Sequence, residues 1–597
     1  MKMVERKNGL SWSGFLANKL LKSEAEKIMA DVQSMQEQQL VPPAVNESYA
    51  DFIVQYSKNV HGPIDYVSDN FFQIINENFA VLYVPLEIVG SLVVNNYSYN
   101  SIPNCYTFMD LDSLNSSGIT NLHNHPYLQL RGRGTAVAVI DSGIDYTHPA
   151  FLEGTRTRIA AIWDQSLPSI GQENIPYGRE FTREEIQQAL DSDRPMEIVP
   201  STDTNGHGTF LAGIAAGSTM PASNFSGAAP EASIIVVKLK QAKQYLRDFY
   251  LLPQDVPAFQ ENDVMFGIWY AMRKARELRM PLSVCIGLGS NLGAHRGSSP
   301  LAQYLSSASR YSENVFSIAA GNEGNTRHHF FDTINARENQ LTVELRVGEG
   351  EPGFVVEFWG DSPGAYSMKV QSPTGEVLPV STARGNGFQI LSFVFVETRI
   401  EVSYVPVERV TGETLFFFRF LSPASGIWRF LVSGEQQEEM PFHMWLPSRP
   451  FLSEQTYFLQ PYPYNTITNP GNAAEAITVT AYNYRDQSLY LAASRGYAAG
   501  GGIKPDLAAP GVDILGPGPR GSFVSRSGTS VAAALNCGAA ALLFEWAIVR
   551  ENVVYMNGIT VRNYLTRGAR RRDGEKYPNP DWGYGALDLY NVFENLL

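Results

Sequence analysis

The spacing of apolar and polar positions changes twice along this chain of 597 residues. From about residue 115 to 325, short apolar runs with almost no polar alternation are separated by helical patterns. Strands buried on both faces have this pattern, as in parallel sheets covered by helices. We therefore predict an α/β region. Its strands are expected at 136–140, 233–239, 282–287 and 315–320, with a helix over 264–278.

Between about 327 and 462 apolar residues alternate with polar ones at a period of two, and Gly, Pro and Ser clusters separate the runs. That pattern predicts an all-β sandwich or jelly roll. The α/β pattern resumes at 476–481, so the β region is inserted within the α/β region. The predicted strands are 341–347, 353–359, 366–370, 400–405, 414–420 and 426–432.

Upstream of the α/β region the pattern differs again. The first 45 residues are polar and helix-prone, which predicts a loose arm. Strands are expected at 52–56 and 79–84, and a helix is expected from Pro85, because proline is favoured in the first turn. The sequence thus divides into an arm (1–45), a small α+β unit (46–109), an α/β part (110–326), a β insert (327–464) and a second α/β part (465–597).

Composition narrows the functional classes. The net charge of −14 makes nucleic acids and acidic membranes poor partners, so we predict neither. No run approaches the ~18 apolar residues of a membrane helix. The basic N-terminus lacks the apolar core of a secretion signal, which predicts synthesis in the cytoplasm and leaves later release or storage open.

The cysteines do not suggest a special role. Cys105, Cys285 and Cys537 are odd in number and lie far apart, which fits neither a disulfide framework nor a zinc site. We expect them to be small buried apolar residues.

Three Gly-rich turns carry the candidate chemistry. Asp141 ends an apolar strand before Ser-Gly, His207 lies within Asn-Gly-His-Gly-Thr, and Ser530 ends Gly-Thr-Ser before a run of small apolar residues. An acid, a histidine and a serine of this kind are the parts of a nucleophilic hydrolase. Ser530 would be the nucleophile, His207 the general base and Asp141 the residue that orients the base. Alone, Ser530 is equally typical of a helix N-cap, and Asp145 is a structural rival of Asp141.

The order Asp, His, Ser and the sequence around each residue resemble the subtilisin-like serine proteases. The resemblance implies that Asn322, in Ala-Ala-Gly-Asn-Glu-Gly, and the Ser530 N–H form an oxyanion hole. Without it, the Asn322 segment is an ordinary turn. A glycine-rich segment after the 282–287 strand resembles the part that pairs with extended substrate and lines the P1 pocket, although it is otherwise a strand-to-helix loop. Its residues are Gly287, Leu288, Gly289, Ser290, Asn291 and Gly293.

Most subtilases have Met-Ala-Ser-Pro-His after the serine, whereas this chain has Val-Ala-Ala-Ala-Leu over 531–535. That form, with the β insert, resembles the Csp germination proteases of spore-forming clostridia. The resemblance implies a jelly-roll insert and a propeptide (46–109) that the enzyme cuts itself and keeps in its cleft. We place that cut between Tyr106 and Asp112. The implied substrate is the zymogen of a spore-cortex lytic enzyme, and the implied location is the spore.

Two other functions stay open at this point. One is a general-turnover intracellular subtilase. The other is a pseudoprotease that binds a partner or a germinant, although all three catalytic residues are retained and favour activity.

No cofactor or metal is predicted. His123 with His125, and His328 with His329, are possible metal pairs, but no carboxylate or thiolate completes either set nearby. The segment after Gly217 is shorter than the calcium-binding loop of subtilisin, so we predict no calcium ion there.

Overall fold

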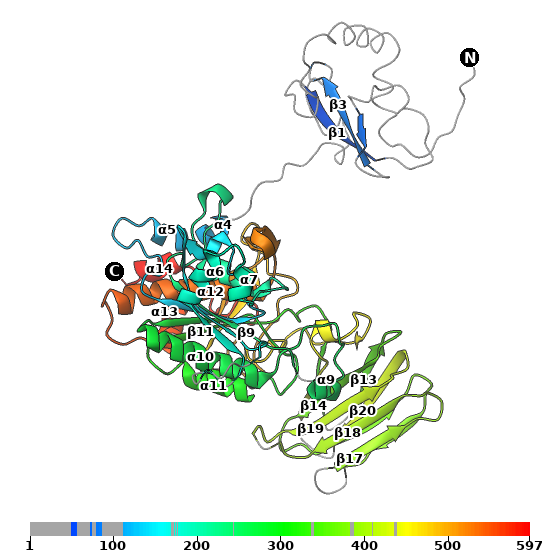
Figure 1. The fold of residues 1–597 in the computed structure, drawn as a ribbon. Helices are drawn as coiled ribbons and strands as arrows, with labels where there is room; N and C mark the ends of the chain where they lie inside the picture. Colours follow the sequence, from blue (N-terminus) through cyan, green and yellow to red (C-terminus); the bar gives the residue numbers. More distant parts are fainter. Residues whose placement is uncertain are drawn as a thin grey trace, which may run out of the picture. The chain divides into compact units, whose positions relative to one another are not determined.

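The computed structural model describes residues 49–55, 72–74, 79–85, 87 and 111–596, with gaps at 169–171, 173–174, 176, 243, 336–339, 383–386, 409 and 435–438. The chain forms two units, Met1–Phe108 and Met109–Leu597. In the first, β1 (Tyr49–Gln55), β2 (Phe72–Ile74) and β3 (Phe79–Pro85) form an antiparallel sheet in the order β1-β3-β2 (Figure 1). Strands β1 and β3 match the two predicted strands, and β2 was not predicted as a strand. The predicted arm and almost all of the helix from Pro85 lie outside the described residues.

The second unit is built on an eight-stranded sheet in the order β24-β23-β11-β10-β4-β9-β7-β8. All neighbouring pairs are parallel except β7 and β8. The four strands predicted in the first α/β part and the one predicted at 476–481 are present, so the α/β prediction is confirmed. The strands are β4 (Ala136–Asp141), β7 (Ile159–Asp164), β8 (Arg179–Thr182), β9 (Ser233–Lys238), β10 (Leu282–Ile286), β11 (Asn314–Ala319), β23 (Ile477–Tyr482) and β24 (Leu507–Pro510).

Both faces of this sheet are buried because successive side chains point to opposite sides. Val137 and Val139 of β4 join the apolar cluster around α12 (Thr529–Phe544), whereas Ala138 joins the cluster around α10 (Glu261–Leu278) on the other face. Figure 1 shows α10 and α11 on the side of the sheet opposite α12. The remaining helices are α4 (Leu111–Ser116), α5 (Ile119–His123), α6 (Arg183–Leu190), α7 (Pro195–Ile198), α8 (His207–Ala216), α9 (Gln244–Tyr250), α11 (Pro300–Ala308), α13 (Gly558–Gly568) and α14 (Leu589–Glu594).

Helix α12 runs through the centre of the unit, and every one of its residues is buried. With the π-helical turn Glu545–Val549 it forms a segment of 21 residues with mean hydropathy 1.6, long and apolar enough to cross a membrane. The prediction that no run approaches this length was therefore wrong. Because 89% of the segment is buried inside the protein, it is a core helix. Small residues allow this: a Cβ on Gly538 would lie 2.5 Å from the carbonyl oxygen of Ala215 in α8.

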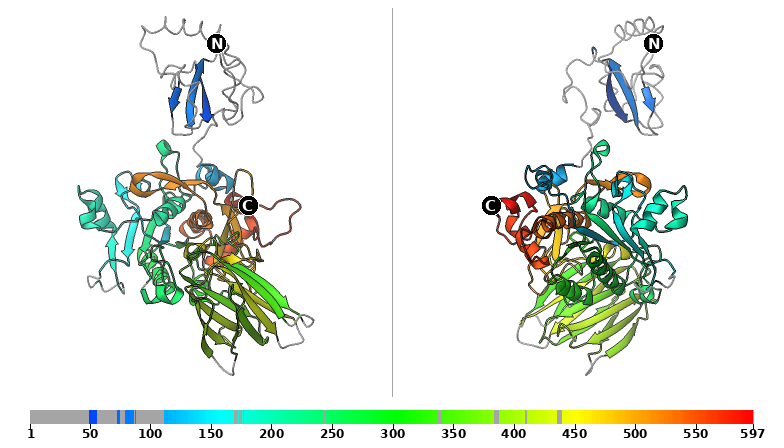
Figure 2. Two further views of the ribbon diagram at one scale, coloured as in Figure 1. Left: turned by 90° about the vertical axis from the view of Figure 1, so that its right-hand side faces the viewer. Right: turned by 60° about the vertical axis from the view of Figure 1, so that its left-hand side comes forward.

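Residues 329–458 form two antiparallel sheets beside the main sheet (Figure 2). One has the order β12-β21-β14-β19-β18-β17 and the other β16-β15-β20-β13-β22. Alternate residues of their strands face a shared aromatic-rich cluster that includes Phe358, Phe418 and Trp428. The strands are β12 (His329–Ile334), β13 (Gln340–Val347), β14 (Gly353–Gly360), β15 (Tyr366–Gln371), β16 (Val377–Val380), β17 (Gly387–Ser392), β18 (Arg399–Val405), β19 (Thr414–Leu421), β20 (Gly426–Gly434), β21 (Met440–Trp445) and β22 (Tyr457–Phe458).

Candidate active site

Asp141 is the last residue of β4, at the carboxyl edge of the sheet, and it is 1% exposed. Open α/β sheets carry their sites at this edge. One carboxylate oxygen, Oδ1, accepts a hydrogen bond of 2.7 Å from the N–H of Ser142. The rival Asp145 is engaged elsewhere, because its Oδ1 accepts from the Thr147 hydroxyl and its Oδ2 from the N–H of Arg520 at 2.9 Å.

His207 opens helix α8, directly after Gly206 in the left-handed region at φ 77°. The carboxylate of Asp203 fixes this start, because it accepts from the N–H groups of Gly206 (2.8 Å) and Thr209 (2.9 Å). The next residue must be glycine, since a Cβ on Gly208 would lie 2.2 Å from the backbone oxygen of Gly143. This close approach brings the His207 Nδ1 within 2.8 and 2.9 Å of the two carboxylate oxygens of Asp141.

Ser530 is the second residue of helix α12 and is 8% exposed. Its Oγ lies 3.2 Å from the Nε2 of His207. The structure therefore brings the three predicted residues, 389 positions apart at the extremes, into one hydrogen-bonded chain from carboxylate to imidazole to hydroxyl. The helix N-terminus also places a partial positive charge beside the Ser530 oxygen.

Asp141 and His207 each stabilise the charged form of the other. Burial alone raises the pKa of Asp141, but the positive charge of His207 and its hydrogen bond outweigh burial, so the net shift is downward. For His207, burial lowers the pKa, and the carboxylate of Asp141 outweighs it, so the net pKa is raised. An imidazole held this way by a carboxylate is a stronger base toward a neighbouring hydroxyl.

Asn322 lies beside the nucleophile. Its side-chain oxygen Oδ1 accepts from the N–H and the hydroxyl of Thr529, at 3.2 and 3.3 Å. The amide is close to the nucleophile: a Cβ on Gly528 would lie 3.5 Å from Ser530 Oγ, 3.6 Å from Asn322 Nδ2 and 3.9 Å from Asn322 Oδ1. Asn322 and Ser530 thus both border the space beside Gly528. Sequence reasoning missed Thr529, although its place beside Ser530 was visible.

The first part of the predicted substrate segment also adjoins the nucleophile. A Cβ on Gly287 would lie 3.1 Å from His207 Cε1 and 3.2 Å from Ser530 Cβ. Gly289 packs against Thr468, and a Cβ on Gly289 would lie 2.4 Å from the Oγ1 of Thr468. No residue larger than glycine fits at either position without displacing these groups.

The second part of the segment needs a correction. The N–H and C=O of Ser290 are both bonded to the backbone of Asn469, each at 2.8 Å, so they are not open to a substrate strand. Asn291 is 1% exposed and donates its amide to the Leu446 carbonyl at 2.9 Å, and the Gly293 N–H donates to Glu357 at 2.7 Å. Asn291 and Gly293 thus attach the segment to the β insert, and Ser290 attaches it to the second α/β part.

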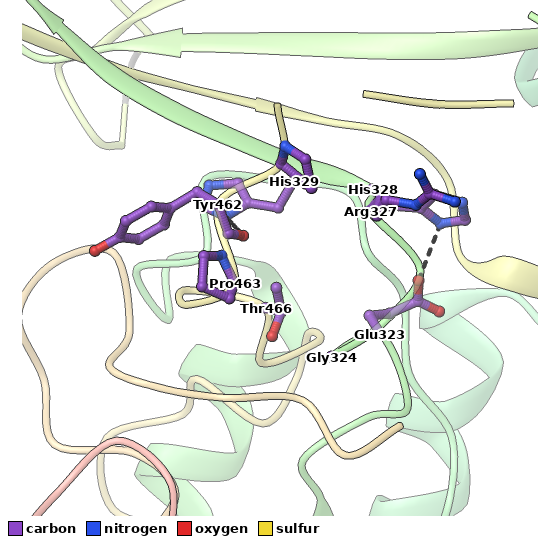
Figure 3. Close-up of a pocket in the computed structure, with 9 residues that line it drawn as sticks. Glu323, Gly324, Arg327, His328, His329, Tyr462, Pro463 and Thr466 are labelled. Atoms are coloured by element: carbon purple, nitrogen blue, oxygen red, sulfur yellow. Dashed lines mark hydrogen bonds and ion pairs between the residues drawn. The ribbon is translucent and has the colours of Figure 1, made fainter. Parts of the chain in front are cut away.

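The two histidine pairs do not form shared ligand sets. His123 and His125 point to different partners: His123 bonds the Ala228 carbonyl, and burial lowers its pKa to about 4. In Figure 3, His328 turns toward Glu323 (Nδ1 to Oε2, 3.1 Å) while His329 turns away toward Tyr462. The described residues contain no group of three His, Cys, Asp or Glu side chains placed to hold a metal ion.

Two of the cysteines are described, and both are free and fully buried, as predicted. Burial raises the pKa of both thiols, to about 12 for Cys537. Cys105 lies outside the described residues.

The profile of the peptidase S8 subtilase family matches residues 132–346 and 462–585, more than half of the chain. The chain belongs to the subtilase family. It has the subtilisin-like α/β fold, and members of this family are serine endopeptidases. The break in the match corresponds to most of the β insert.

A solved structure of the CspB protease of Clostridium perfringens is 34% identical, with a TM-score of 0.72 and coverage of 81% of this chain and 97% of that chain. The membrane-bound transcription factor site-1 protease of Mus musculus is 32% identical over 139 residues, 22% of this chain and 13% of that protein. The C5a peptidase of Streptococcus pyogenes serotype M6 is 24% identical over 446 residues, 69% of this chain and 34% of that protein. This subtilase thus spans only a small part of the curated relatives it matches.

Proposed function

We propose that this subtilase is an active serine endopeptidase in which Ser530 attacks the peptide carbonyl. His207 takes the hydroxyl proton and later gives it to the leaving amine, while Asp141 holds the imidazole in the required tautomer. Asn322 Nδ2 and the Ser530 N–H stabilise the tetrahedral oxyanion. The observation that carries the proposal is the continuous chain of contacts at 2.8 and 3.2 Å that ends at the hydroxyl of Ser530.

We further propose a role like that of the Csp proteases. Similarity to the CspB protease over 81% of the chain supports it. In this proposal the two antiparallel sheets are the jelly-roll insert, and residues 46–109 are a propeptide that the enzyme removes itself and keeps in its cleft. A cut propeptide whose end stays in the cleft is a product inhibitor at very high effective concentration. The substrate is a cortex-lytic zymogen, and the enzyme is stored in the spore.

N-terminal sequencing of purified wild type and Ser530→Ala tests both parts. The wild type is expected to yield a new N-terminus between Tyr106 and Asp112, and the variant an uncut chain. A fluorophosphonate probe should label Ser530 in the wild type only. An identical chain length in both proteins, with no labelling after the propeptide is displaced, would instead favour a pseudoprotease that binds a partner.

A broad substrate range would change the second part only. If the purified enzyme digests casein and cleaves a cortex-lytic zymogen at many positions, the general-turnover function replaces the germination function. A single cut in the zymogen with intact casein supports the proposal.

A further inference from the structure

One cation lies beside the catalytic histidine without an acidic partner. Arg526 is the last residue of β26 (Phe523–Arg526), four positions before Ser530, and it is partly exposed. Its Nη2 donates to the carbonyl of Asn205 at 3.3 Å, and its guanidinium lies 5.7 Å from the ring centre of Phe210. Within the part of the chain that the structure describes, no carboxylate oxygen lies within 4 Å of it.

The acids of this neighbourhood are already engaged. Both oxygens of Asp203 accept N–H groups at the start of α8. Asp141 is bonded to His207. Asp513, on the loop before β25 (Ile514–Pro517), accepts from Ser527 Oγ at 3.3 Å and pairs with Arg485 at 3.6 Å. The positive charge of Arg526 is therefore not neutralised by the protein itself.

The position of this charge relative to the reaction follows from the chemistry. His207 delivers its proton to the leaving amine, so the residues after the scissile bond pass on the His207 side of the nucleophile. Arg526 is bound to the carbonyl two residues before His207, and its Nη2 lies 3.2 Å from where a Cβ on Gly206 would be.

We propose that Arg526 is a specificity-determining residue that favours substrates with Asp or Glu in the first two positions after the scissile bond. This inference rests on the proposed endopeptidase function and names its substrate class, which is peptides with an acidic residue just after the scissile bond. A planar guanidinium with free N–H groups matches a carboxylate in a forked geometry. The chain carries a net charge of −14, so a local cation is needed to hold an acidic residue at this point of the cleft.

The sequence of the proposed self-cleavage region agrees with this class. Between Tyr106 and Asp112 the chain reads Tyr-Thr-Phe-Met-Asp-Leu-Asp, so a cut made after any of residues 108–111 places Asp110 or Asp112 in the first two positions after the scissile bond. The inference therefore predicts self-cleavage after one of these four residues, not after Tyr106 or Thr107.

The test compares cleavage of a proteome-derived peptide library by the full-length wild type, Arg526→Met and Arg526→Glu, with N-terminal sequencing of the products. The methionine retains an unbranched apolar side chain and removes the charge together with the hydrogen bond to the Asn205 carbonyl. We expect Asp and Glu to be enriched about 5- to 10-fold after the cut in the wild type, as for a partly desolvated ion pair, and not in Arg526→Met. Arg526→Glu should enrich Lys and Arg instead. Arg520→Met, on the same hairpin, is the matched control and should keep the wild-type profile.

A purely structural role predicts a different outcome, in which both Arg526 variants lower the cleavage of all peptides equally and leave the residue preferences unchanged. That result overturns the inference, as does a wild type that cleaves without acidic preference, while the endopeptidase function stands. A wild type that yields no Ser530-dependent product even after the propeptide is displaced removes the proposed function itself.

Self-processing provides a second readout. The double substitution Asp110→Lys with Asp112→Lys should slow the appearance of the cut chain about 5- to 10-fold, and adding Arg526→Glu should restore it. If Arg526→Glu slows the lysine variant further, the charges do not meet and the inference is wrong.

Discussion

The oxyanion donor allows the sharpest test of the active site. In Asn322→Ala the amide Nδ2 is removed, while the Ser530 N–H and the relay through His207 remain. Losing one of two donors is expected to cost about 3–4 kcal/mol in the transition state, which is on the order of 100- to 1000-fold in kcat. The substrate makes this contact only as the oxyanion forms, so KM should change little.

The same variant should fold normally. The Asn322 side chain is exposed, and its oxygen accepts from the N–H and the hydroxyl of Thr529. Losing them should lower the free energy of unfolding by about 1 kcal/mol. Thr529→Val tests the orientation of the amide: it removes the hydroxyl donor and should lower kcat less than Asn322→Ala, and Thr529→Ser should restore activity.

The assay is steady-state cleavage of an internally quenched peptide by full-length chains after the propeptide is displaced, with unfolding followed separately by circular dichroism. A loss of kcat below 10-fold in Asn322→Ala, or a change confined to KM, would mean that Nδ2 does not face the reacting oxygen. The assignment of Asn322 as an oxyanion donor would then be refuted, and a different group would have to stabilise the oxyanion formed by attack of Ser530.

Three further outcomes are expected. Asp141→Asn should lower kcat by about four orders of magnitude because the amide favours the wrong tautomer of His207, and a loss below 10-fold in the peptide assay would exclude Asp141 as the orienting residue. Gly538→Ala should lower the free energy of unfolding by about 1–3 kcal/mol, because the new Cβ would lie 2.5 Å from the Ala215 oxygen. Gly387→Ala, with open space around it, should have no such effect, and equal melting temperatures of the two variants would contradict the close packing of α12 on α8. Burial lowers the pKa of His295 from 6.5 to about 4, so the folded state resists protonation. The free energy of unfolding should be at its full value above about pH 6.5 and should fall by about 3 kcal/mol toward pH 4. The denaturant midpoint of the wild type should therefore fall more than that of His295→Asn between pH 7 and 4.5, and a flat midpoint in the wild type would contradict this.

The residues of the hydrogen-bonded chain were predictable because each turn carries its own local signal. Gly206 has φ 77°, the backbone oxygen of Gly143 leaves no room for a Cβ on Gly208, and a strand of buried-type residues leads into Asp141. The helix predicted over 264–278 is present and begins three residues earlier, at Glu261. These features depend on residues that are close in sequence.

The missed features depend on distant partners or short elements. Strand β24 has only four residues and ends in Pro510, too few for a periodic pattern. Strand β7 is an apolar run of five residues that ends in Asp164, and periodicity alone does not distinguish such a run from a helix segment. The role of Asn291 was invisible because its bonding partners, Leu446 and Ser448, lie more than 150 residues away.

The β insert lies between Asn322 and Ser530 in the sequence, yet it does not separate them in space. Its two ends are held together, because the Phe458 N–H donates to the Arg327 carbonyl at 3.0 Å and the Tyr462 N–H to the His329 carbonyl at 2.8 Å. The chain therefore leaves and re-enters the α/β fold at one place.

The insert also reaches the cleft by a second route. Arg296, just after the substrate segment, forms ion pairs with Glu413 and Asp361 of the insert, and the ring of His295 stacks on Trp445 at 4.3 Å. Together with the Gly293 N–H on Glu357, these contacts join the insert to the segment that begins at Gly287 beside Ser530. Any movement of the insert must therefore be transmitted to the segment that begins at Gly287, so the two sheets constrain the backbone beside Ser530.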